Sequence, residues 1–445
     1  SESLITKMLS LVGNGTFESS AADMQLKFVK NGLRYRITSG TEVSVAKYNP
    51  TASAIVIPDT VSESNKTFLV KSIDDIAFAN CGNITSVDVQ NSSTNKYITE
   101  ISRGAFAWCY NLTSAMLANT IEEIGNGAFR NCNLSSVVIP SNVTTIDSNA
   151  YNGCNNITSV TINSEYDIEY DSLDLYFTSG NIRYKVMDKD VVYVVSKQTA
   201  YSGDVIIPSI VHSGTDFDVT AIDNNAFTGC SLTSITIPSS VLSVSYAFSN
   251  CTVSSSINIL TDADFTNSYL YFINNSLKYK VLNKNSISVM SNSYTGDIVI
   301  PSSVSKGNTF SVVKVEASAF YACSGLTSVV IPDSVKTIDS LAFYSCSGLK
   351  SLTIGKTETI SSNAFNYTTN IETLSYNNDL MGSLITSIKT KLKNVTVGDS
   401  VTMSKETFKS YTQLITATVY AATVSESAFN GCTALTTVTL GDESV

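Results

Sequence analysis

The sequence lacks most of the residue patterns on which catalysis, metal binding and membrane insertion depend. Its 445 residues include a single histidine, His212, and contain neither a Gly-x-Ser-x-Gly nor a Cys-x-x-Cys motif. A catalytic triad would need a nucleophile and an acid in recognisable motifs beside this histidine, and the sequence has none. We therefore interpret His212 as a solvated loop residue. No apolar run approaches the roughly 18 residues that span a bilayer. We therefore expect a chain without enzyme activity, without a metal or cofactor, and without a membrane-spanning segment.

Positive charge is also scarce. The chain has 28 lysines and arginines against 38 aspartates and glutamates, which gives a net charge of −10. Because an acidic protein repels phosphate backbones, we expect no nucleic-acid partner. Several of the acids gather with tyrosines in the segment SEYDIEYDSLDLYF, residues 164–177. This segment is interpreted as a solvated linker, with a calcium site or a binding patch as alternatives.

The nine cysteines all stand at one place in a short motif. Each ends a five-residue string of the form Ala-Phe-x-x-Cys or Ala-Tyr-x-x-Cys: Cys81, Cys109, Cys132, Cys154, Cys230, Cys251, Cys323, Cys346 and Cys432. A residue that recurs at one fixed position is a packing residue, and cysteine can behave as a small buried hydrophobe. The odd count also argues against a complete disulfide framework. We predict reduced, buried thiols, with disulfides or metal ligands as alternatives.

The motif belongs to a longer repeat with a period of 21 to 23 residues. After the cysteine comes an alternating apolar string such as LTSVVI (326–331) or LKSLTI (349–354), and then a turn and Val-x-x-Ile. Alternation indicates strands, and a fixed short period is typical of a solenoid. We predict a β-rich leucine-rich repeat solenoid, a right-handed superhelix of stacked parallel strands. Short turns or single helical turns join the strands, and an aromatic side chain fills each rung.

Three segments interrupt this period and resemble one another. Each pairs two aromatic residues seven positions apart around a turn-forming pair: Phe28 and Tyr35, Phe177 and Tyr184, Phe272 and Tyr279. This spacing predicts three inserted β-hairpin modules. They divide the solenoid, 25–445, into superrepeats 25–164, 165–260 and 261–445. Residues 1–24 are expected to form a capping helix or a leader, and 383–393 has helical spacing.

Two strings carry a resemblance to a known family. The repeat IPxxVxxIxxxAFxxCxxLxSVxI and the opening LRYRI…IVIP…FxVxxI together resemble the BspA-like leucine-rich repeat proteins, over roughly residues 25–445. The rungs at Phe365, which lacks the cysteine, and Phe408 depart from the pattern. The resemblance implies a secreted or cell-surface protein of the kind found in gut and oral bacteria and parasitic protists, with an export signal upstream of residue 1. It implies adhesion and brings no catalytic residue.

Aromatic side chains that packing does not explain are the best candidates for ligand contacts. Tyrosine and tryptophan offer a large contact area at a small entropic cost. The candidates are Trp108, Tyr110, Tyr166, Tyr170 and Tyr176. The hypothesis is a non-catalytic surface protein that binds host or microbial surface proteins, and the alternative is a surface protein that captures glycans. Outward hydroxyls such as Thr158, Thr233, Thr327 and Thr436 are either strand residues or a second binding surface.

Overall fold

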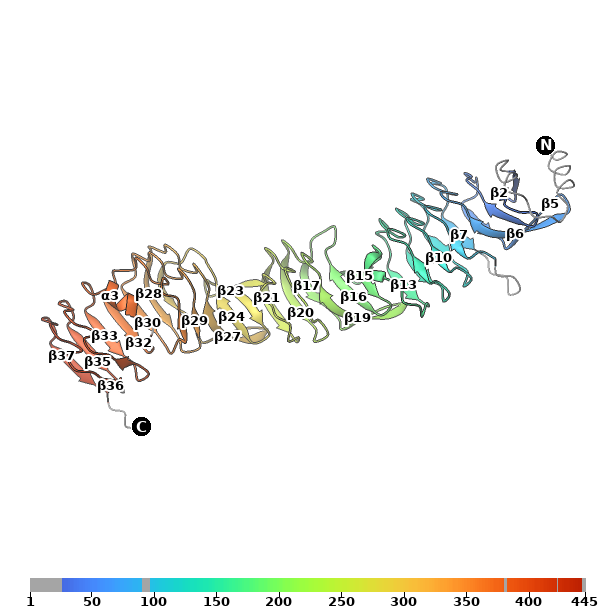
Figure 1. Ribbon diagram of the computed structural model, residues 1–445. Coiled ribbons are helices and arrows are strands. Elements are labelled where there is room, and N and C mark those ends of the chain that lie inside the picture. Colours follow the sequence, from blue (N-terminus) through green and yellow to red (C-terminus); the bar gives the residue numbers. More distant parts are fainter. Residues whose placement is uncertain (1–25, 90–96, 380–381, 422, 442–445) are drawn as a thin grey trace. The chain divides into compact units, whose positions relative to one another are not determined.

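The computed structural model describes residues 26–89, 97–379, 382–421 and 423–441 (Figure 1). The expected capping helix or leader at 1–24 lies outside the described residues. The chain forms two compact units: unit 1 comprises Ser1–Gln198 and Ile207–Ala226, and unit 2 comprises Thr199–Ile206 and Phe227–Val445. These boundaries differ from the three superrepeats, so we retain the superrepeat division as a proposal.

Unit 1 consists almost entirely of short strands. They are β1 (Lys27–Lys30), β2 (Leu33–Ile37), β3 (Glu42–Val45), β4 (Ala54–Ile57), β5 (Thr60–Glu63), β6 (Lys66–Ile73), β7 (Ser86–Val89), β8 (Glu100–Ile101), β9 (Ser114–Met116), β10 (Glu123–Ile124), β11 (Ser136–Ile139), β12 (Thr145–Ile146), β13 (Ser159–Ile162), β14 (Tyr176–Ser179), β15 (Ile182–Asp188), β16 (Val191–Val195), β18 (Ile210–Ser213) and β19 (Thr215–Ile222), with one 3-10 turn, η1 (Tyr170–Ser172).

Unit 2 repeats the same construction. Its strands are β17 (Ser202–Ile206), β20 (Ser231–Ile237), β21 (Thr252–Ile259), β22 (Tyr271–Asn274), β23 (Leu277–Asn283), β24 (Ser286–Val289), β25 (Gly296–Val299), β26 (Ser303–Lys306), β27 (Asn308–Val315), β28 (Leu326–Ile331), β29 (Thr337–Ile338), β30 (Ser351–Ile354), β31 (Thr359–Ile360), β32 (Thr373–Tyr376), β33 (Asn394–Val397), β34 (Thr402–Met403), β35 (Thr416–Val419), β36 (Thr423–Val424) and β37 (Thr437–Leu440), with the short helix α3 (Gly382–Ser387).

The plain rungs stack by parallel pairing of equivalent strands. In β28 and β30, Val329 lies opposite Leu352 and Ile331 opposite Ile354, so the apolar residues of successive rungs point into one core. The Val-x-x-Ile arc forms a second parallel stack, in which β8, β10 and β12 align Ile101, Ile124 and Ile146. Stacking buries a face that one rung could not bury alone. The prediction of a β-rich solenoid of stacked parallel strands is confirmed.

The three hairpin modules are also confirmed. In each, two strands pair antiparallel and place the predicted aromatic residues opposite one another: Phe28 with Tyr35, Phe177 with Tyr184, and Phe272 with Tyr279. The ring centroids are 5.4 Å apart in every pair. A third strand, β3, β16 or β24, then returns to parallel pairing with β6, β19 or β27, and the stack continues.

The aromatic residues form a ladder through the core. In unit 1 the rings of Phe78, Phe106, Phe129 and Tyr151 stack at centroid distances of 5.2, 5.4 and 5.5 Å, with planes within 7° of one another. In unit 2 Phe343 lies between Phe320 and Phe365, at 4.7 and 5.0 Å. Offset stacking adds to the area that each ring buries. The predicted aromatic filling of each rung is confirmed.

Eight of the nine cysteines are buried as predicted, Cys432 is half-buried, and several of them also bind the preceding rung. None of the nine, all of which lie in the described residues, forms a disulfide. The Sγ of Cys132 donates a hydrogen bond to the carbonyl oxygen of Phe106 (3.1 Å), and that of Cys346 donates to Phe320 (3.0 Å). In the rung without cysteine, the Thr368 hydroxyl donates to the carbonyl oxygen of Phe343 in the same way. In the rung of Phe408 the same position is held by Tyr411, whose hydroxyl donates to the carbonyl oxygen of Ile385, so all three residue types at this position donate a hydrogen bond.

Burial lowers the reactivity of the most enclosed of these thiols. It raises the pKa of Cys109, Cys154 and Cys346 to about 12. Since the thiolate is the nucleophile, only about one such thiol in ten thousand is ionised at pH 8. We expect a disulfide-exchange reagent to modify the folded protein very slowly at pH 8 and to find close to nine thiols in denaturant. Recovery of one thiol and four bridges from unfolded, unreduced protein would contradict this.

The C-terminal helix is shorter than the sequence predicted. The apolar spacing of Leu384, Ile388 and Leu392 is real, because all three are buried, but α3 ends at Ser387 rather than at Lys393. The reason is the register of the next rung, since Asn394 must pair with Thr373 as β33 begins. The residues between therefore form turns.

Candidate functional site

Each plain rung turns a corner two residues after its core aromatic residue, with the backbone in the left-handed region. The corner residues have φ between 55° and 80°: Asn80, Trp108, Asn131, Gly153, Gly229, Asn250, Ala322, Ser345, Tyr367, Ser410 and Gly431. Asparagine and glycine adopt this conformation readily, whereas a bulky side chain is strained there. At this corner Trp108 (φ 60°) and Tyr367 (φ 62°) are therefore the bulky exceptions; elsewhere in the rungs Ile76, Tyr246 and Leu341 also adopt left-handed φ. Strain of this kind clusters at functional sites.

Trp108 and Tyr110 lie next to this corner in unit 1. The Trp108 side chain is half-buried, and the guanidinium of Arg130 lies 5.9 Å from the centroid of its ring. Tyr110 is 60% exposed. The sequence interpretation of both as aromatic side chains outside the core agrees with these positions. The backbone N–H of Trp108 donates to the carbonyl oxygen of Arg130 (2.7 Å), so the next rung holds the strained corner in place.

In the acidic segment after β13, one tyrosine side chain is exposed and another is buried. Tyr166 is 52% exposed, whereas Tyr170 is 1% exposed and lies in η1. Treating Tyr170 as an exposed contact is therefore wrong. Its neighbours Ile168, Leu173 and Leu175 are buried as well, so the apolar side chains of this segment point into the core. Burial raises the pKa of the Tyr170 phenol far above its usual value.

Tyr176 is half-buried and already has protein partners. Its hydroxyl donates to a carboxylate oxygen of Asp174 (3.3 Å), and the Arg183 guanidinium lies 4.3 Å from its ring centroid. Burial, followed by the nearby Asp174 charge, raises the pKa of the phenol. One face of this ring is therefore covered by an arginine, and Tyr176 offers a ligand less area than Tyr110 or Tyr166.

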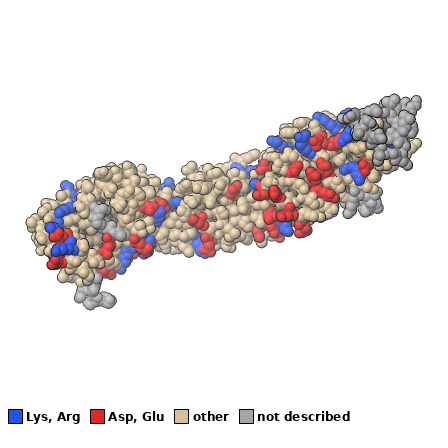
Figure 2. All heavy atoms as spheres, viewed as in Figure 1, with Lys and Arg blue, Asp and Glu red and all other residues tan. Residues whose placement is uncertain are grey.

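The acidic side chains of this segment form a solvated negative surface. Glu165, Asp167, Glu169 and Asp171 are exposed. Figure 2 shows acidic side chains gathered along one stretch of unit 1. Within the described ranges, no three histidine, cysteine, aspartate or glutamate residues come together as a metal site would require. The geometry thus gives the calcium alternative no support, and the segment is better described as a charged surface.

A row of tyrosines in unit 2 was not among the candidate contact residues chosen from the sequence. The rings of Tyr321 and Tyr344 stack at 5.1 Å with planes 2° apart, and Tyr367 meets Tyr344 edge-on at 5.1 Å. Tyr321 is 50% and Tyr367 is 68% exposed. The sequence signal was available, since Tyr321 and Tyr344 each directly follow the core phenylalanine of adjacent rungs. This tyrosine row presents ring edges and hydroxyls, because the stacked faces cover one another.

The outward threonines are used mainly within the protein. Thr158 donates to the carbonyl oxygen of Ser135, and Thr436 to that of Ile415, each at 3.2 Å. Thr327 and Ser328 both donate to Asp297, at 2.7 and 2.6 Å. The two hydroxyls, Ser328 first, hold the pKa of Asp297 below its usual value. These contacts favour the structural interpretation of the hydroxyls over a binding surface.

His212 lies on strand β18 rather than in a loop, which corrects the sequence interpretation. This polar segment forms a hairpin with β19, in which Val211 is buried opposite Phe217 and His212 faces solvent. Its Nδ1 lies 2.6 Å from Asp216, and both side chains are at least 70% exposed. An exposed pair of this kind lacks the enclosure that shifts the pKa of catalytic groups.

No helix in the described part of the chain is long and apolar enough to cross a membrane.

Comparison with known proteins identifies the repeat. A family model described as a BspA type leucine rich repeat region matches residues 71–194, 197–311 and 313–436, with six copies of the repeat. None of the curated proteins compared with the chain matches it.

Three solved structures align with nearly the whole chain. A leucine rich cell surface protein of Faecalibacterium prausnitzii A2-165 is 22% identical over 94% of this chain and 96% of its own, with a TM-score of 0.24. A leucine-rich repeat protein of Bacteroides ovatus is 17% identical over 92% and 94%, with a TM-score of 0.26. The pneumococcal vaccine antigen PcpA is 14% identical over 94% and 99%, with a TM-score of 0.25.

Proposed function

This chain belongs to the BspA-type leucine-rich repeat family, and from that membership we propose that it is a non-catalytic, secreted or cell-surface protein that binds proteins of host or microbial surfaces. A solenoid presents one long surface, and adjacent strands of its stack are about 4.8 Å apart. Such a surface suits recognition of an extended partner by contacts spread over several rungs.

The observation that carries the proposal is the strained corner at Trp108. Equivalent corners use asparagine at positions 80 and 131, where the left-handed backbone costs little. A tryptophan at φ 60° is less stable there. Because its ring is only half-buried, its packing does not offset this backbone strain. Tyr110, two residues along, is 60% exposed, and aromatic side chains of this type supply most of the energy at protein interfaces. Tyr166, beside the exposed carboxylates, is the second anchor, and those carboxylates favour a partner with a basic patch.

The test replaces Trp108 by the residue that its equivalent corners use. We expect Trp108→Asn to leave the melting temperature unchanged or slightly higher, because asparagine suits the corner. We expect it to weaken binding at least about tenfold, as for loss of an aromatic anchor. The measurement is surface plasmon resonance against extracellular-matrix and bacterial surface proteins that bind the unmodified protein.

Thr327→Ala is the matched control, because its hydroxyl already bonds to Asp297. It should change affinity less than about twofold, within the range of peripheral contacts. Unchanged affinity for Trp108→Asn with a loss for Thr327→Ala would move the site to the hydroxyl ladder and refute the assignment of Trp108.

Glycan capture remains the alternative, and the tyrosine row favours it. Tyr321, Tyr344 and Tyr367 line up phenolic hydroxyls across three rungs. A glycan array bound by the unmodified protein, and lost on Tyr367→Asn, would support this alternative. The proposed protein-binding surface uses none of these residues, so the two functions are separable.

A further inference from the structure

In unit 2, the pairing between neighbouring strands is incomplete at the start of the chain's third hairpin module. Neighbouring plain rungs pair over four residues, as β28 and β30 do. In contrast, β21 pairs with the hairpin strand β22 through a single pair, Thr252 with Tyr271. Farther along β21, Ile257 forms a bridge with Gly307 at the β26–β27 turn. The residues between these two points face a gap in the stack.

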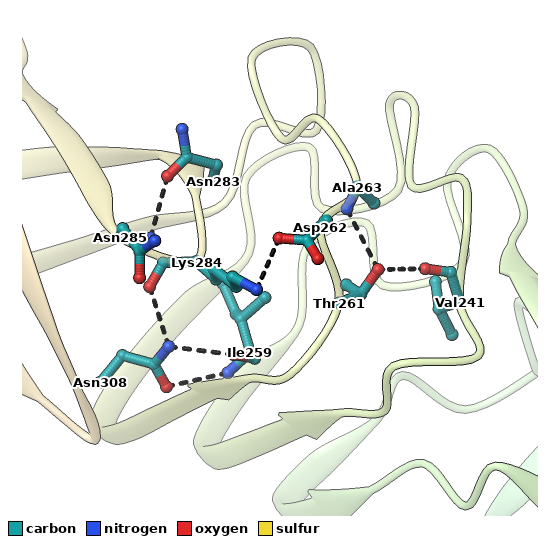
Figure 3. Close-up of polar contacts among 9 residues, drawn as sticks. All are labelled: Val241, Ile259, Thr261, Asp262, Ala263, Asn283, Lys284, Asn285 and Asn308. Atoms are coloured by element: carbon teal, nitrogen blue, oxygen red, sulfur yellow. Dashed lines mark hydrogen bonds and ion pairs between the residues drawn. The ribbon is translucent and has the colours of Figure 1, made fainter.

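Asn308 fixes the far end of this gap. Its side-chain amide donates to the carbonyl oxygens of Ile259 (3.0 Å) and Lys284 (2.9 Å), and its side-chain oxygen accepts from the Ile259 N–H (3.0 Å), as Figure 3 shows. One side chain therefore ties the end of β21 to the β23–β24 turn. Asn308 and the Gly307 bridge together hold the C-terminal end of β21 in place.

Around the Thr252–Tyr271 pair lies a hollow of about 540 Å³, which we call the β21–β22 hollow. Its lining residues include Asn250, Thr252 and Ser254 beside β21, Tyr271, Ile273 and Lys278 on the hairpin, and Asn292. This volume lies within the range of about 300–1,000 Å³ that is usual for small-ligand sites. Ile273 is 59% exposed, so an apolar surface is left open beside the polar groups.

Lys278 is the charged group of the hollow. Its Nζ lies 4.9 Å from the ring centroid of Tyr271, and among the described residues no carboxylate lies within ion-pair distance of it. The lysine at the end of the same strand differs, because the Lys284 ammonium contacts Asp262 at 2.5 Å (Figure 3). The Lys306 ammonium, which lies outside the lining, donates to the carbonyl oxygen of Ser254 (2.5 Å). In a chain with a net charge of −10, a hollow with uncompensated positive charge favours an anion.

The remaining groups indicate which anion. The amides of Asn250 and Asn292 and the hydroxyls of Thr252 and Ser254 are donors and acceptors for several hydroxyl groups. Tyr271 and Ile273 offer apolar contact to the C–H face of a ring. The lining residues cluster around the Thr252–Tyr271 pair and do not extend along the length of β21, as an extended peptide would require. A short cyclic ligand fits this enclosure better.

We propose that the β21–β22 hollow binds a sugar ring that carries a carboxylate, as in the uronic acids of acidic polysaccharides. The carboxylate lies against the Lys278 ammonium, the ring against Tyr271 and Ile273, and its hydroxyls against the amides and hydroxyls of the rim. This site goes beyond the protein-binding function proposed above and shares no residue with it.

The test compares two disaccharides that differ only in the carboxylate. Isothermal titration calorimetry of the whole chain with cellobiouronic acid should show binding, and cellobiose should bind at least about tenfold more weakly. Lys278→Gln should weaken cellobiouronic acid binding at least about tenfold, whereas Lys284→Gln, the same charge change on a lysine already paired with Asp262, should alter it less than about twofold. Raising the salt concentration should weaken binding to the unmodified protein.

A second variant keeps the test decisive if Lys278→Gln does not fold. Ile273→Asp changes an exposed side chain of the hollow and should repel the carboxylate, with a loss of affinity similar to that of Lys278→Gln. Equal affinity for the two disaccharides, no binding of cellobiouronic acid, or full affinity in Lys278→Gln would each overturn the proposal. Tighter, Lys278-dependent binding of tetraglutamate would assign the hollow to an acidic peptide and overturn it as well.

Discussion

Phe343→Ala should lower the free energy of unfolding by about 3–5 kcal/mol, the usual range for truncation of a buried phenylalanine. The Phe343 side chain has no exposed surface and stacks on Phe320 and Phe365 at 4.7 and 5.0 Å. Its removal leaves a cavity that the stiff strands on either side cannot fill. The measurement is urea unfolding followed by fluorescence and circular dichroism.

The damage should remain local, because each rung of a solenoid packs only on its neighbours. Hydrogen exchange should quicken in β28, β30 and β32 and remain unchanged in unit 1. Tyr344→Ala, one residue along and in the half-buried tyrosine row, is the control and should cost about 1 kcal/mol or less, as for a surface substitution. Equal effects of the two substitutions would mean that the aromatic ladder does not stabilise the stack.

Gly307→Ala should cost about 2–3 kcal/mol, near the upper end of what backbone strain at one residue costs. Gly307 has φ 93°, and a Cβ there would lie 2.5 Å from the Ile257 carbonyl oxygen. The substitution therefore both strains the backbone and pushes the β26–β27 turn away from β21. Differential scanning calorimetry would report the loss.

Gly229→Ala separates these two causes. It has a similar left-handed φ of 68°, but a Cβ would meet no atom within 4 Å. Its cost should be about 1 kcal/mol, the strain contribution alone. If the two variants lose equal stability, the turn does not depend on close docking against β21. The first module is consistent with this argument: no rung precedes it among the described residues, and its turn uses Ser64 and Asn65, at φ 51° and 64°, rather than glycine.

Repetition made most of the fold predictable from sequence. Phe106, Phe129 and Phe343 occupy the same position in their rungs, and the same spacing in three modules predicted the hairpin pairing of Phe177 with Tyr184 and Phe272 with Tyr279. A residue that recurs is constrained by its neighbours above and below, so its environment can be inferred from the pattern. The buried thiols followed from the same reasoning.

Features that occur once could not be inferred in this way. Tyr170 lies in a segment whose counterpart before the third hairpin has Phe265 at the same distance from the hairpin phenylalanine, but the acidic residues around Tyr170 suggested exposure, and its burial comes from the structure. The β21–β22 hollow results from missing strand pairing, which depends on register rather than on residue type, and Lys278 looks in the sequence like any surface lysine. The Trp108 corner lay between these cases. Alignment of the rungs would have placed Trp108 among asparagines and glycines, but only the structure gives its φ of 60°.

The contact made by Thr368 shows which property the rung needs at the cysteine position. Its hydroxyl reaches the Phe343 carbonyl oxygen just as Cys346 reaches that of Phe320, so the sulfur atom itself is dispensable. Replacing each buried cysteine by threonine should therefore give a thiol-free protein that keeps this hydrogen bond. A single cysteine reintroduced on the surface, for example beside Tyr110 or Ile273, would then be the unique attachment point for a fluorophore or a photocrosslinker. Bound partners could be located rung by rung.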